Sequence, residues 1–130
     1  MKKTRNSLLV SAIVLTTLTS FLASAMQEFK GSTESFQKII GQGKPVVVKF
    51  YLTNCPACKM YAAPFKMVAD EFSNVIFLAV NGSNNQALQS KYGVSSYPTT
   101  IVFDTNGKKI NQHERVMNAQ ELRQKVKRLQ

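Results

Sequence analysis

The chain has 130 residues, which allows one folded domain, and it carries 17 Lys and Arg against 7 Asp and Glu, a net charge of +10. The basic residues are scattered and no nucleic-acid-binding motif accompanies them, so the charge does not indicate nucleic-acid binding. With two cysteines and one histidine, the composition argues against a tetrahedral zinc site, which needs four ligands.

The first 25 residues have the layout of a secretory signal peptide. Residues 1–5 are basic, residues 8–22 are apolar with interspersed Ser and Thr, and Ala23-Ser24-Ala25 supplies small residues for cleavage. We therefore predict export to the bacterial periplasm and a mature domain of residues 26–130. An uncleaved membrane anchor is the alternative, and membrane contact is expected only in that case. The apolar stretch is short for a spanning helix, which needs about 20 apolar residues.

After this leader, the predicted elements alternate between strand and helix. A weak strand at 27–30 precedes a helix at 32–40, which Ser32 or Thr33 can cap and Gly41 can end. The β-branched run 46–52 is typical of a strand buried on both faces. Residues 56–72 form a helix that Pro56 can begin and that Pro64 should kink.

The second half continues with a strand at 75–80, a polar turn at 81–85 and a short helix at 86–92. Residues 99–104 and 109–115 form a hairpin around an Asn-Gly turn, and Asn118 caps a last helix that reaches about residue 129. The order β-α-β-α-β-α-β-β-α predicts an α/β fold. Its central sheet is mixed, with parallel crossovers first and an antiparallel hairpin last, and helices cover both faces.

Cys55 and Cys58 form a C-x-x-C pair between a predicted buried strand and a predicted helix. A structural disulfide at this spacing closes a very small ring and constrains the unfolded chain little, so the spacing favours a redox site. The helix start offers unpaired N–H groups and the positive end of the macrodipole, which stabilise the nucleophilic thiolate. Cys55 is therefore predicted to be exposed and attacking, and Cys58 to be more buried and resolving.

A metal site is the rival use of two thiols. His113 lies far from Cys55 in the sequence and is expected to be an ordinary surface residue. A two-coordinate Cu(I) site on the pair is chemically allowed, because soft thiolates suit Cu(I). Met60 and Met67 stand at helical spacing, which is more typical of core residues than of copper ligands. We predict no metal and no cofactor, since thiol–disulfide exchange needs none.

Two segments carry a family resemblance. Residues 47–58, followed by Lys59-Met60, resemble the active-site strand and helix of the thioredoxin family. The segment Tyr-Gly-Val-Ser-Ser-Tyr-Pro-Thr at 92–99 resembles the stretch before the fourth strand of that family. The similarity covers essentially the whole mature domain. It implies the thioredoxin fold, a thiol–disulfide oxidoreductase that acts on protein substrates, and a redox partner protein that regenerates the cysteine pair.

The resemblance also implies supporting residues around the pair. Pro98 is expected to follow a cis peptide bond and to lie against the C-x-x-C, although a plain strand-initiating proline is the alternative. The backbone at Tyr97 is expected to pair with an extended substrate segment. The residues expected to face the substrate are Asn54, Pro56, Ala57, Tyr97 and Thr99.

The sequence departs from the family at several positions. Lys49 replaces a buried acid six residues before the first cysteine. It either favours thiolates by its opposite charge, which makes the disulfide more oxidising, or extends to the surface without a role. Tyr51 and Asn54 stand where thioredoxins have tryptophan. Pro64 is one residue further along than in thioredoxin, which predicts a local bulge near residues 62–63 or, alternatively, an altered kink.

The direction of exchange depends on potential and partner rather than on the motif. We expect a monomeric reductase, because the chain is a bare domain of thioredoxin size. A thiol oxidase or isomerase of the same fold is one alternative. A Cu(I)-binding protein and a thioredoxin-fold module with a purely structural disulfide are the others.

Overall fold

The computed structural model describes residues 25–130, so the predicted signal peptide and its cleavage lie outside the described residues, apart from Ala25. The elements, in chain order, are β1 (Met26–Phe29), α1 (Thr33–Ile40), β2 (Val46–Tyr51), α2 (Pro56–Glu71), β3 (Ile76–Asn81), the 3-10 turn η1 (Gly82–Asn84), α3 (Gln86–Tyr92), β4 (Thr99–Phe103), β5 (Lys109–His113) and α4 (Ala119–Lys127). Within residues 25–130, no helix combines the length and the apolarity needed to cross a membrane.

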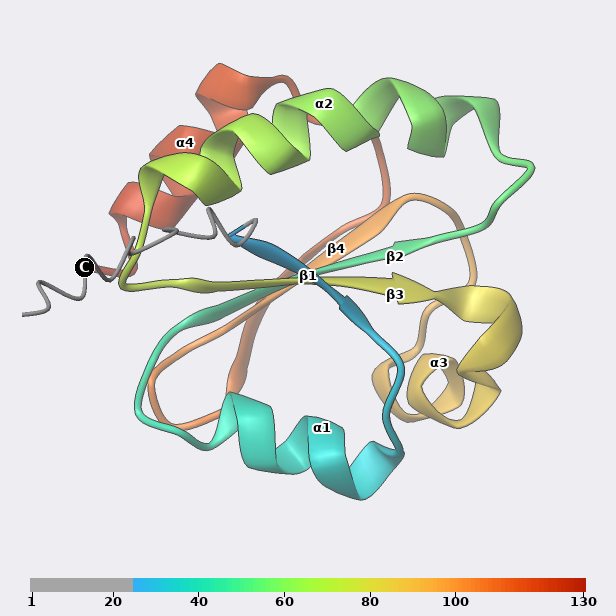
Figure 1. Ribbon diagram of the computed structural model, residues 1–130, viewed down its shortest axis with the longest axis horizontal. Helices are drawn as coiled ribbons and strands as arrows, with labels where there is room; N and C mark the ends of the chain where they lie inside the picture. Colours follow the sequence, from blue (N-terminus) through green and yellow to red (C-terminus); the bar gives the residue numbers. More distant parts are fainter. Residues whose placement is uncertain (1–24) are drawn as a thin grey trace, which may run out of the picture.

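The five strands form one mixed sheet in the order β1-β3-β2-β4-β5. Strands β1, β3 and β2 run parallel, whereas β4 pairs antiparallel with β2 and β5 pairs antiparallel with β4. Helices α2 and α4 cover one face of the sheet and α1 and α3 cover the other (Figure 1). The predicted architecture is therefore confirmed, with β2 at the centre of the sheet.

Local capping explains where the helices begin and end. The Ser32 hydroxyl accepts the backbone N–H of Ser35 at 3.3 Å, and the Asn118 side chain accepts the N–H of Glu121 at 2.8 Å. Gly93 ends α3 with a φ of 65°, a left-handed conformation that glycine adopts without a steric penalty. The predicted caps of α1 and α4 are confirmed.

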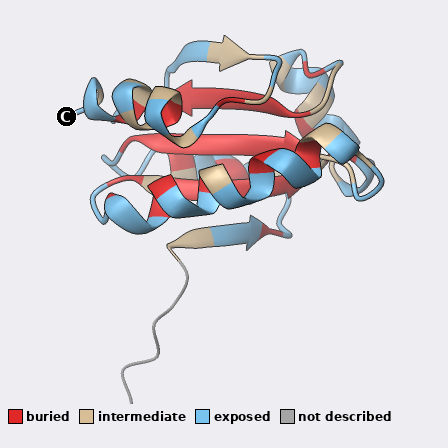
Figure 2. Cartoon of the chain, turned by 90° about the horizontal axis from the view of Figure 1, so that it is seen from above, coloured by how far each residue is buried: buried red, intermediate tan, exposed pale blue. Residues whose placement is uncertain are grey.

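Two apolar clusters hold the sheet and its helices together, one on each face. Figure 2 shows the central strands buried, with exposed residues on the outer sides of the helices in front of them. The cluster under α1 and α3 contains Phe29, Phe36, Ile40, Val46, Val48, Phe50, Leu78, Val80, Leu88, Val94, Ile101 and Phe103. The cluster under α2 and α4 contains Val47, Tyr61, Phe65, Val68, Ala69, Phe72, Val75, Phe77, Val102, Met117, Leu122 and Val126. Alternate residues of β2 contribute to the two clusters, which explains its continuous apolar run.

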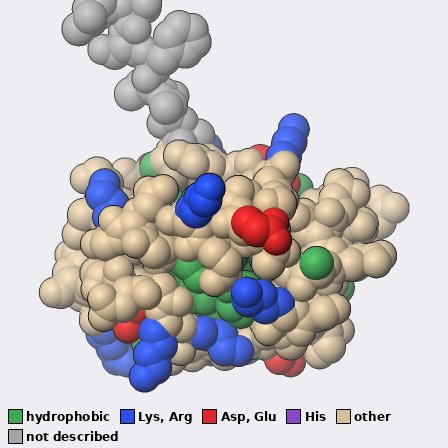
Figure 3. Space-filling view, turned by 90° about the horizontal axis from the view of Figure 1, so that it is seen from below, with side chains coloured by type: hydrophobic (Ala, Val, Ile, Leu, Met, Phe, Trp, Pro, Cys, Tyr) green, Lys and Arg blue, Asp and Glu red, His purple; other side chains and the backbone are tan. Residues whose placement is uncertain are grey.

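The outer side of the α1 and α3 layer carries part of the basic surface. Figure 3 shows this side, on which Lys and Arg side chains border a hollow of hydrophobic side chains. Such an arrangement suits a basic protein whose charges are scattered over its surface.

Helix α2 corrects two expectations. It is α-helical without interruption from Pro56 to Glu71, so the bulge predicted near residues 62–63 is wrong. Pro64 deprives only the Met60 carbonyl of its helical donor, and Met60 is 71% exposed, so water can reach that turn. Met60 and Met67 are not core residues, because Tyr61, Phe65 and Val68 occupy the inward positions of the helix.

Candidate active site

The cysteine pair lies where β2 ends and α2 begins. Cys55 is the N-cap residue of α2 and Pro56 is its first helical residue. A disulfide joins Cys55 to Cys58, and the backbone N–H of Cys58 donates to the sulfur of Cys55 at 3.1 Å. Cys55 is partly exposed, whereas Cys58 is 4% exposed. The helix N-terminus therefore points its positive end and one of its free donors at the more accessible sulfur.

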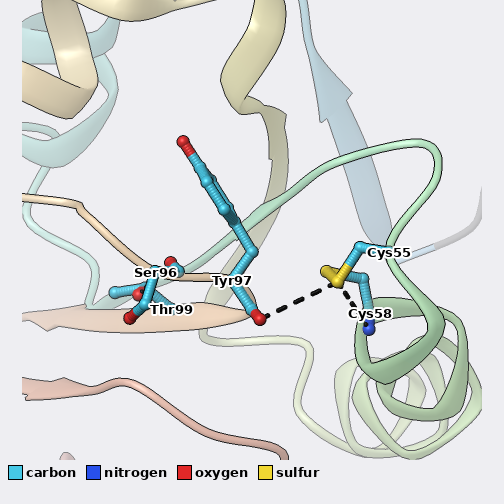
Figure 4. Close-up of a disulfide and its surroundings, with 5 residues drawn as sticks. All are labelled: Cys55, Cys58, Ser96, Tyr97 and Thr99. Carbon is cyan, nitrogen blue, oxygen red and sulfur yellow. Dashed lines mark hydrogen bonds between the residues drawn. A yellow bond between two sulfur atoms is a disulfide. The ribbon is translucent and has the colours of Figure 1, made fainter.

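The loop before β4 closes over the other side of the disulfide. The Tyr97–Pro98 peptide bond is cis, at the position where the family resemblance implied one. The carbonyl oxygen of Tyr97 lies 3.8 Å from the sulfur of Cys55 (Figure 4). In the disulfide this sulfur carries no proton, so the approach is a van der Waals contact. A thiol at Cys55 would have this carbonyl in reach as a weak acceptor.

The side chain of Tyr97 points away from the disulfide (Figure 4). Its hydroxyl donates to the side-chain oxygen of Gln89 on α3, and the amide nitrogen of Gln89 donates to the carbonyl of Gly82. A Cβ at Gly82 would lie 2.7 Å from the Tyr97 hydroxyl, so a larger residue there would force the tyrosine side chain to shift. This network fixes the loop through its side chain and leaves the Tyr97 backbone beside the disulfide.

The other residues predicted to face a substrate divide into two groups. Asn54 and Pro56 are exposed and Ala57 is partly exposed around the disulfide. Thr99 is fully buried, and its hydroxyl donates to the Ser96 carbonyl at 2.7 Å. The prediction that Thr99 faces the substrate is therefore wrong for its side chain, because strand β4 turns it into the protein, where it supports the loop.

Lys49 lies in the middle of β2 and is 4% exposed, so the alternative in which its side chain extends to the surface is wrong. Its ammonium nitrogen lies 4.9 Å from the ring centroid of Phe65, 5.6 Å from that of Tyr51 and 5.9 Å from that of Tyr61. Burial lowers the pKa of Lys49, and the charge of Glu28 partly opposes that shift. Three aromatic rings thus surround a cation that burial disfavours.

Cross-strand pairing places Lys49 in a row of residues under α2. The register aligns Glu28 with Ala79, Ala79 with Lys49, Lys49 with Thr100, and Thr100 with His113. The buried hydroxyl of Thr100 donates to the hydroxyl of Tyr61 at 3.0 Å, and desolvation raises the pKa of that tyrosine. A polar row therefore crosses the sheet on the face that carries the cysteine helix.

A pocket of about 300 Å³ opens between this row and the start of α2. Cys58 and Lys49 both line it, and the small side chains of Ala62 and Ala79 leave the space between helix and sheet. A larger, more polar pocket of about 630 Å³ adjoins it, since Glu28 and Tyr51 border both. The buried cysteine and the buried lysine thus share one cavity.

His113 differs from the expectation of an ordinary surface residue. It is only partly exposed, and its Nε2 atom is buried without a hydrogen-bond partner. Burial, followed by the charges of Lys125 and Arg115, lowers the pKa of His113. It lies on β5, two strands from β2, so it is not brought to the cysteines. Residues 25–130 contain no cluster of three or more His, Cys, Asp or Glu side chains suited to a metal.

Tyr61, Ala79 and Glu28 belong to this site, and sequence reasoning missed them. Tyr61 stands three residues after Cys58, so helical periodicity could have placed both on the buried face. Ala79 and Glu28 are brought to Lys49 only by the register of two parallel strands. That register is a property of the assembled sheet, and the local sequence carries no signal for it.

The thioredoxin family model matches residues 27–128. The chain is a member of the thioredoxin family. It is 32% identical over 78 residues to a thioredoxin of Mycoplasma genitalium, covering 60% of this chain and 76% of that protein. It is also 40% identical over 79 residues to protein disulfide-isomerase 1 of Dictyostelium discoideum, covering 56% of this chain and 22% of the isomerase.

Solved thioredoxin structures have the same fold. The Trypanosoma brucei brucei thioredoxin matches with a TM-score of 0.68 and 31% identity, covering 78% of this chain and 88% of that one. The Malassezia sympodialis thioredoxin matches with a TM-score of 0.73 and 25% identity, covering 82% and 91%. These relatives confirm the predicted class of enzyme, a thiol–disulfide oxidoreductase. The C-x-x-C spacing of Cys55 and Cys58 and the disulfide between them support the same activity. The chain spans about a fifth of the isomerase, so it corresponds to one part of that longer protein.

Proposed function

We propose that this thioredoxin-family protein is an exported reductase that delivers electrons from its reduced cysteine pair to disulfides of protein substrates in the bacterial periplasm. One observation carries the proposal: the accessible sulfur of Cys55 sits at the N-terminus of α2 and receives the Cys58 N–H at 3.1 Å. A donor and a helix dipole aimed at a sulfur stabilise its thiolate, which is the attacking form.

The reaction is an exchange of bonds between sulfurs. The Cys55 thiolate attacks one sulfur of a substrate disulfide, a mixed disulfide forms, and the other substrate sulfur leaves as a thiolate that takes a proton from solvent. Cys58 then attacks the sulfur of Cys55, the Cys55–Cys58 bond forms, and the substrate leaves with its second thiol. The substrate disulfide gains two electrons and the cysteine pair loses two. A reduced partner protein must return them.

The backbone of Tyr97 supports recognition of an extended substrate. Among residues 25–130, neither its N–H nor its carbonyl takes part in a hydrogen bond within the protein, apart from the contact with Cys55. An extended segment can pair with such a backbone by strand addition, which places its cysteine next to Cys55. The exposed residues Asn54 and Pro56 would border this segment and influence which substrates fit.

Insulin reduction tests the activity directly. With dithiothreitol as electron donor, the protein comprising residues 26–130 should accelerate insulin precipitation, and Cys55→Ser should abolish the acceleration. Cys58→Ser should instead accumulate mixed disulfides with substrates, because the resolving sulfur is missing. A wild-type protein that is no faster than dithiothreitol alone would reject the oxidoreductase function.

Equilibration with a glutathione buffer tests the direction of exchange. A reduction potential near that of thioredoxin, about −270 mV, supports the reductase, whereas a value near −120 mV would mark an oxidant.

Export is tested separately. The full chain should appear in the periplasmic fraction of a bacterial host with Met26 as its first residue, and a cytoplasmic, unprocessed chain would reject that part of the proposal.

A further inference from the structure

We propose that Lys49 is a positioning residue that stabilises the thiolate form of Cys58 in the reduced protein, and thereby makes the disulfide easier to reduce. The inference rests on the proposed exchange function, because it concerns the second sulfur of the same pair. It assigns a role to the one buried cation of the described core.

The geometry begins with the shared pocket. Lys49 reaches it from β2 and Cys58 reaches it from the first turn of α2, and both are 4% exposed. The ammonium of Lys49 makes no hydrogen bond or ion pair with any described residue, and its close neighbours are the faces of Phe65, Tyr51 and Tyr61. A buried cation without an anionic partner is costly, so a partner that appears in the pocket should be strongly favoured.

Among the charged and titratable groups around Lys49, Glu28 and Cys58 are the two that can carry a negative charge, and only the charge of Cys58 depends on the redox state. From β1 comes Glu28, whose carboxylate accepts the Tyr51 hydroxyl at 2.6 Å. The tyrosines stay neutral, since burial raises the pKa of Tyr51 to about 12 and that of Tyr61 still further. Helix α2 adds Cys58 and the exposed Lys59, while β3 and β4 contribute only Ala79 and Thr100.

The redox state decides whether Cys58 can act as the counter-ion. In the disulfide, its sulfur is neutral and gives Lys49 no charge to pair with. When a donor dithiol reduces the disulfide, the Cys55–Cys58 bond breaks, the pair gains two electrons, and the donor becomes a disulfide. Each sulfur is then a thiol in equilibrium with its thiolate: the helix N-terminus favours the thiolate of Cys55, and the Lys49 ammonium favours the thiolate of Cys58. The new ion pair stabilises the reduced state alone, which shifts the equilibrium toward reduction.

Substitution of Lys49 by Met tests the role, because Met has a similar length, carries no charge and suits an apolar pocket. The variant should shift the equilibrium constant with glutathione about tenfold toward the disulfide, as expected if the cation lowers the Cys58 pKa by about one unit. Lys49→Gln provides a second neutral variant. Lys66→Met is the matched control. It removes the same charge from α2, two turns beyond Cys58, where Lys66 is exposed and paired with Asp70. This variant should change the glutathione equilibrium constant less than twofold.

A second measurement follows the titration of the Cys58 sulfur alone. In a Cys55→Ser background, the ultraviolet absorbance of the thiolate reports the titration of Cys58, after subtraction of a protein that lacks both cysteines. Lys49→Met should raise the Cys58 pKa by about one unit in this background. An unchanged pKa and glutathione constant in both neutral variants, with an active wild type, would overturn the role of Lys49. A wild type without exchange activity would instead reject the proposed function, so the two failures are distinguishable.

Discussion

The two layers that flank the sheet are built from the same strands but differ in chemistry. On the side of α1 and α3, aromatic rings pack against one another, with Phe36 in edge contact with Phe29 at 5.4 Å and Phe103 at 5.8 Å between ring centroids. On the side of α2 and α4, the polar row of Lys49, Thr100 and His113 crosses an otherwise apolar cluster. Helix α2, which begins at the cysteine pair, covers this second cluster.

This difference assigns separate tasks to the two faces of one strand. In β2, Val48 and Phe50 enter the apolar layer, while Lys49 between them enters the polar one. Apolar packing gains free energy from every buried methylene, whereas a buried cation adjusts the charge of a neighbouring group. The α1 and α3 layer should therefore control stability, and the α2 and α4 layer should control the redox pair.

The largest effect should come from a cavity in the apolar layer. Phe36→Ala removes a fully buried ring and should lower the free energy of unfolding by about 3–5 kcal/mol, measured by urea denaturation of the oxidised protein. The glutathione equilibrium constant should stay within about twofold of the wild type, because the ring lies on the other face of the sheet from Lys49. A large shift of that constant would show that the layers are coupled.

A hydroxyl in the polar layer should matter less for stability. Tyr61→Phe leaves the buried Thr100 hydroxyl without its acceptor, which should cost about 1–3 kcal/mol of unfolding free energy. Tyr92→Phe is the matched control, since that hydroxyl accepts from Gln37 at the surface, and it should cost about 0.5 kcal/mol or less. Equal losses for the two variants would contradict the importance of the buried row.

Periodicity in the sequence was sufficient to predict the elements and their order, and the Cys55–Cys58 spacing was sufficient to predict the redox pair. Alternation within β2 also places Lys49 on the same face as Val47 and Tyr51. The row from Glu28 to His113 and the pocket beside Cys58 could not be predicted, because they depend on strand register and on Ala79 being small at one position. The exposure of Met60 was missed for a similar reason: the inward face of α2 is set by the sheet below it.

The size of the expected shift in reduction potential caused by Lys49 also bears on whether the protein reduces or oxidises its substrates. A tenfold shift corresponds to about 30 mV for a two-electron couple, whereas the thioredoxin and strong-oxidant ends of the family differ by about 150 mV. Lys49 alone therefore moves the potential part of the way toward the oxidant end. The proposed reductase function is compatible with this shift.

The cost of the buried cation should depend on pH. In the oxidised protein the pKa of Lys49 is lowered, while in the unfolded chain it lies near 10.4, so the unfolded chain binds more protons between the two values. The free energy of unfolding of the wild type should therefore rise with pH between these two pKa values. At lower pH, the buried ammonium destabilises the folded protein to its full extent. Lys49→Met should therefore be more stable than the wild type at neutral pH, and the difference in unfolding free energy should shrink as the pH approaches 10.4. Urea denaturation at several pH values measures it, and a constant difference would contradict the assignment.

The smallest effect should come from a lysine of the same helix layer that faces solvent. Lys66→Met removes an ion pair with Asp70 at 2.7 Å, in which both side chains are about half exposed. Water and salt screen such pairs, so the urea midpoint should change within experimental error, at low and at high ionic strength. The contrast with Lys49→Met would then be due to burial, because residue type, net charge change and helix layer are the same. A clear loss of stability in Lys66→Met that disappears in salt would show that surface charge also contributes to this layer.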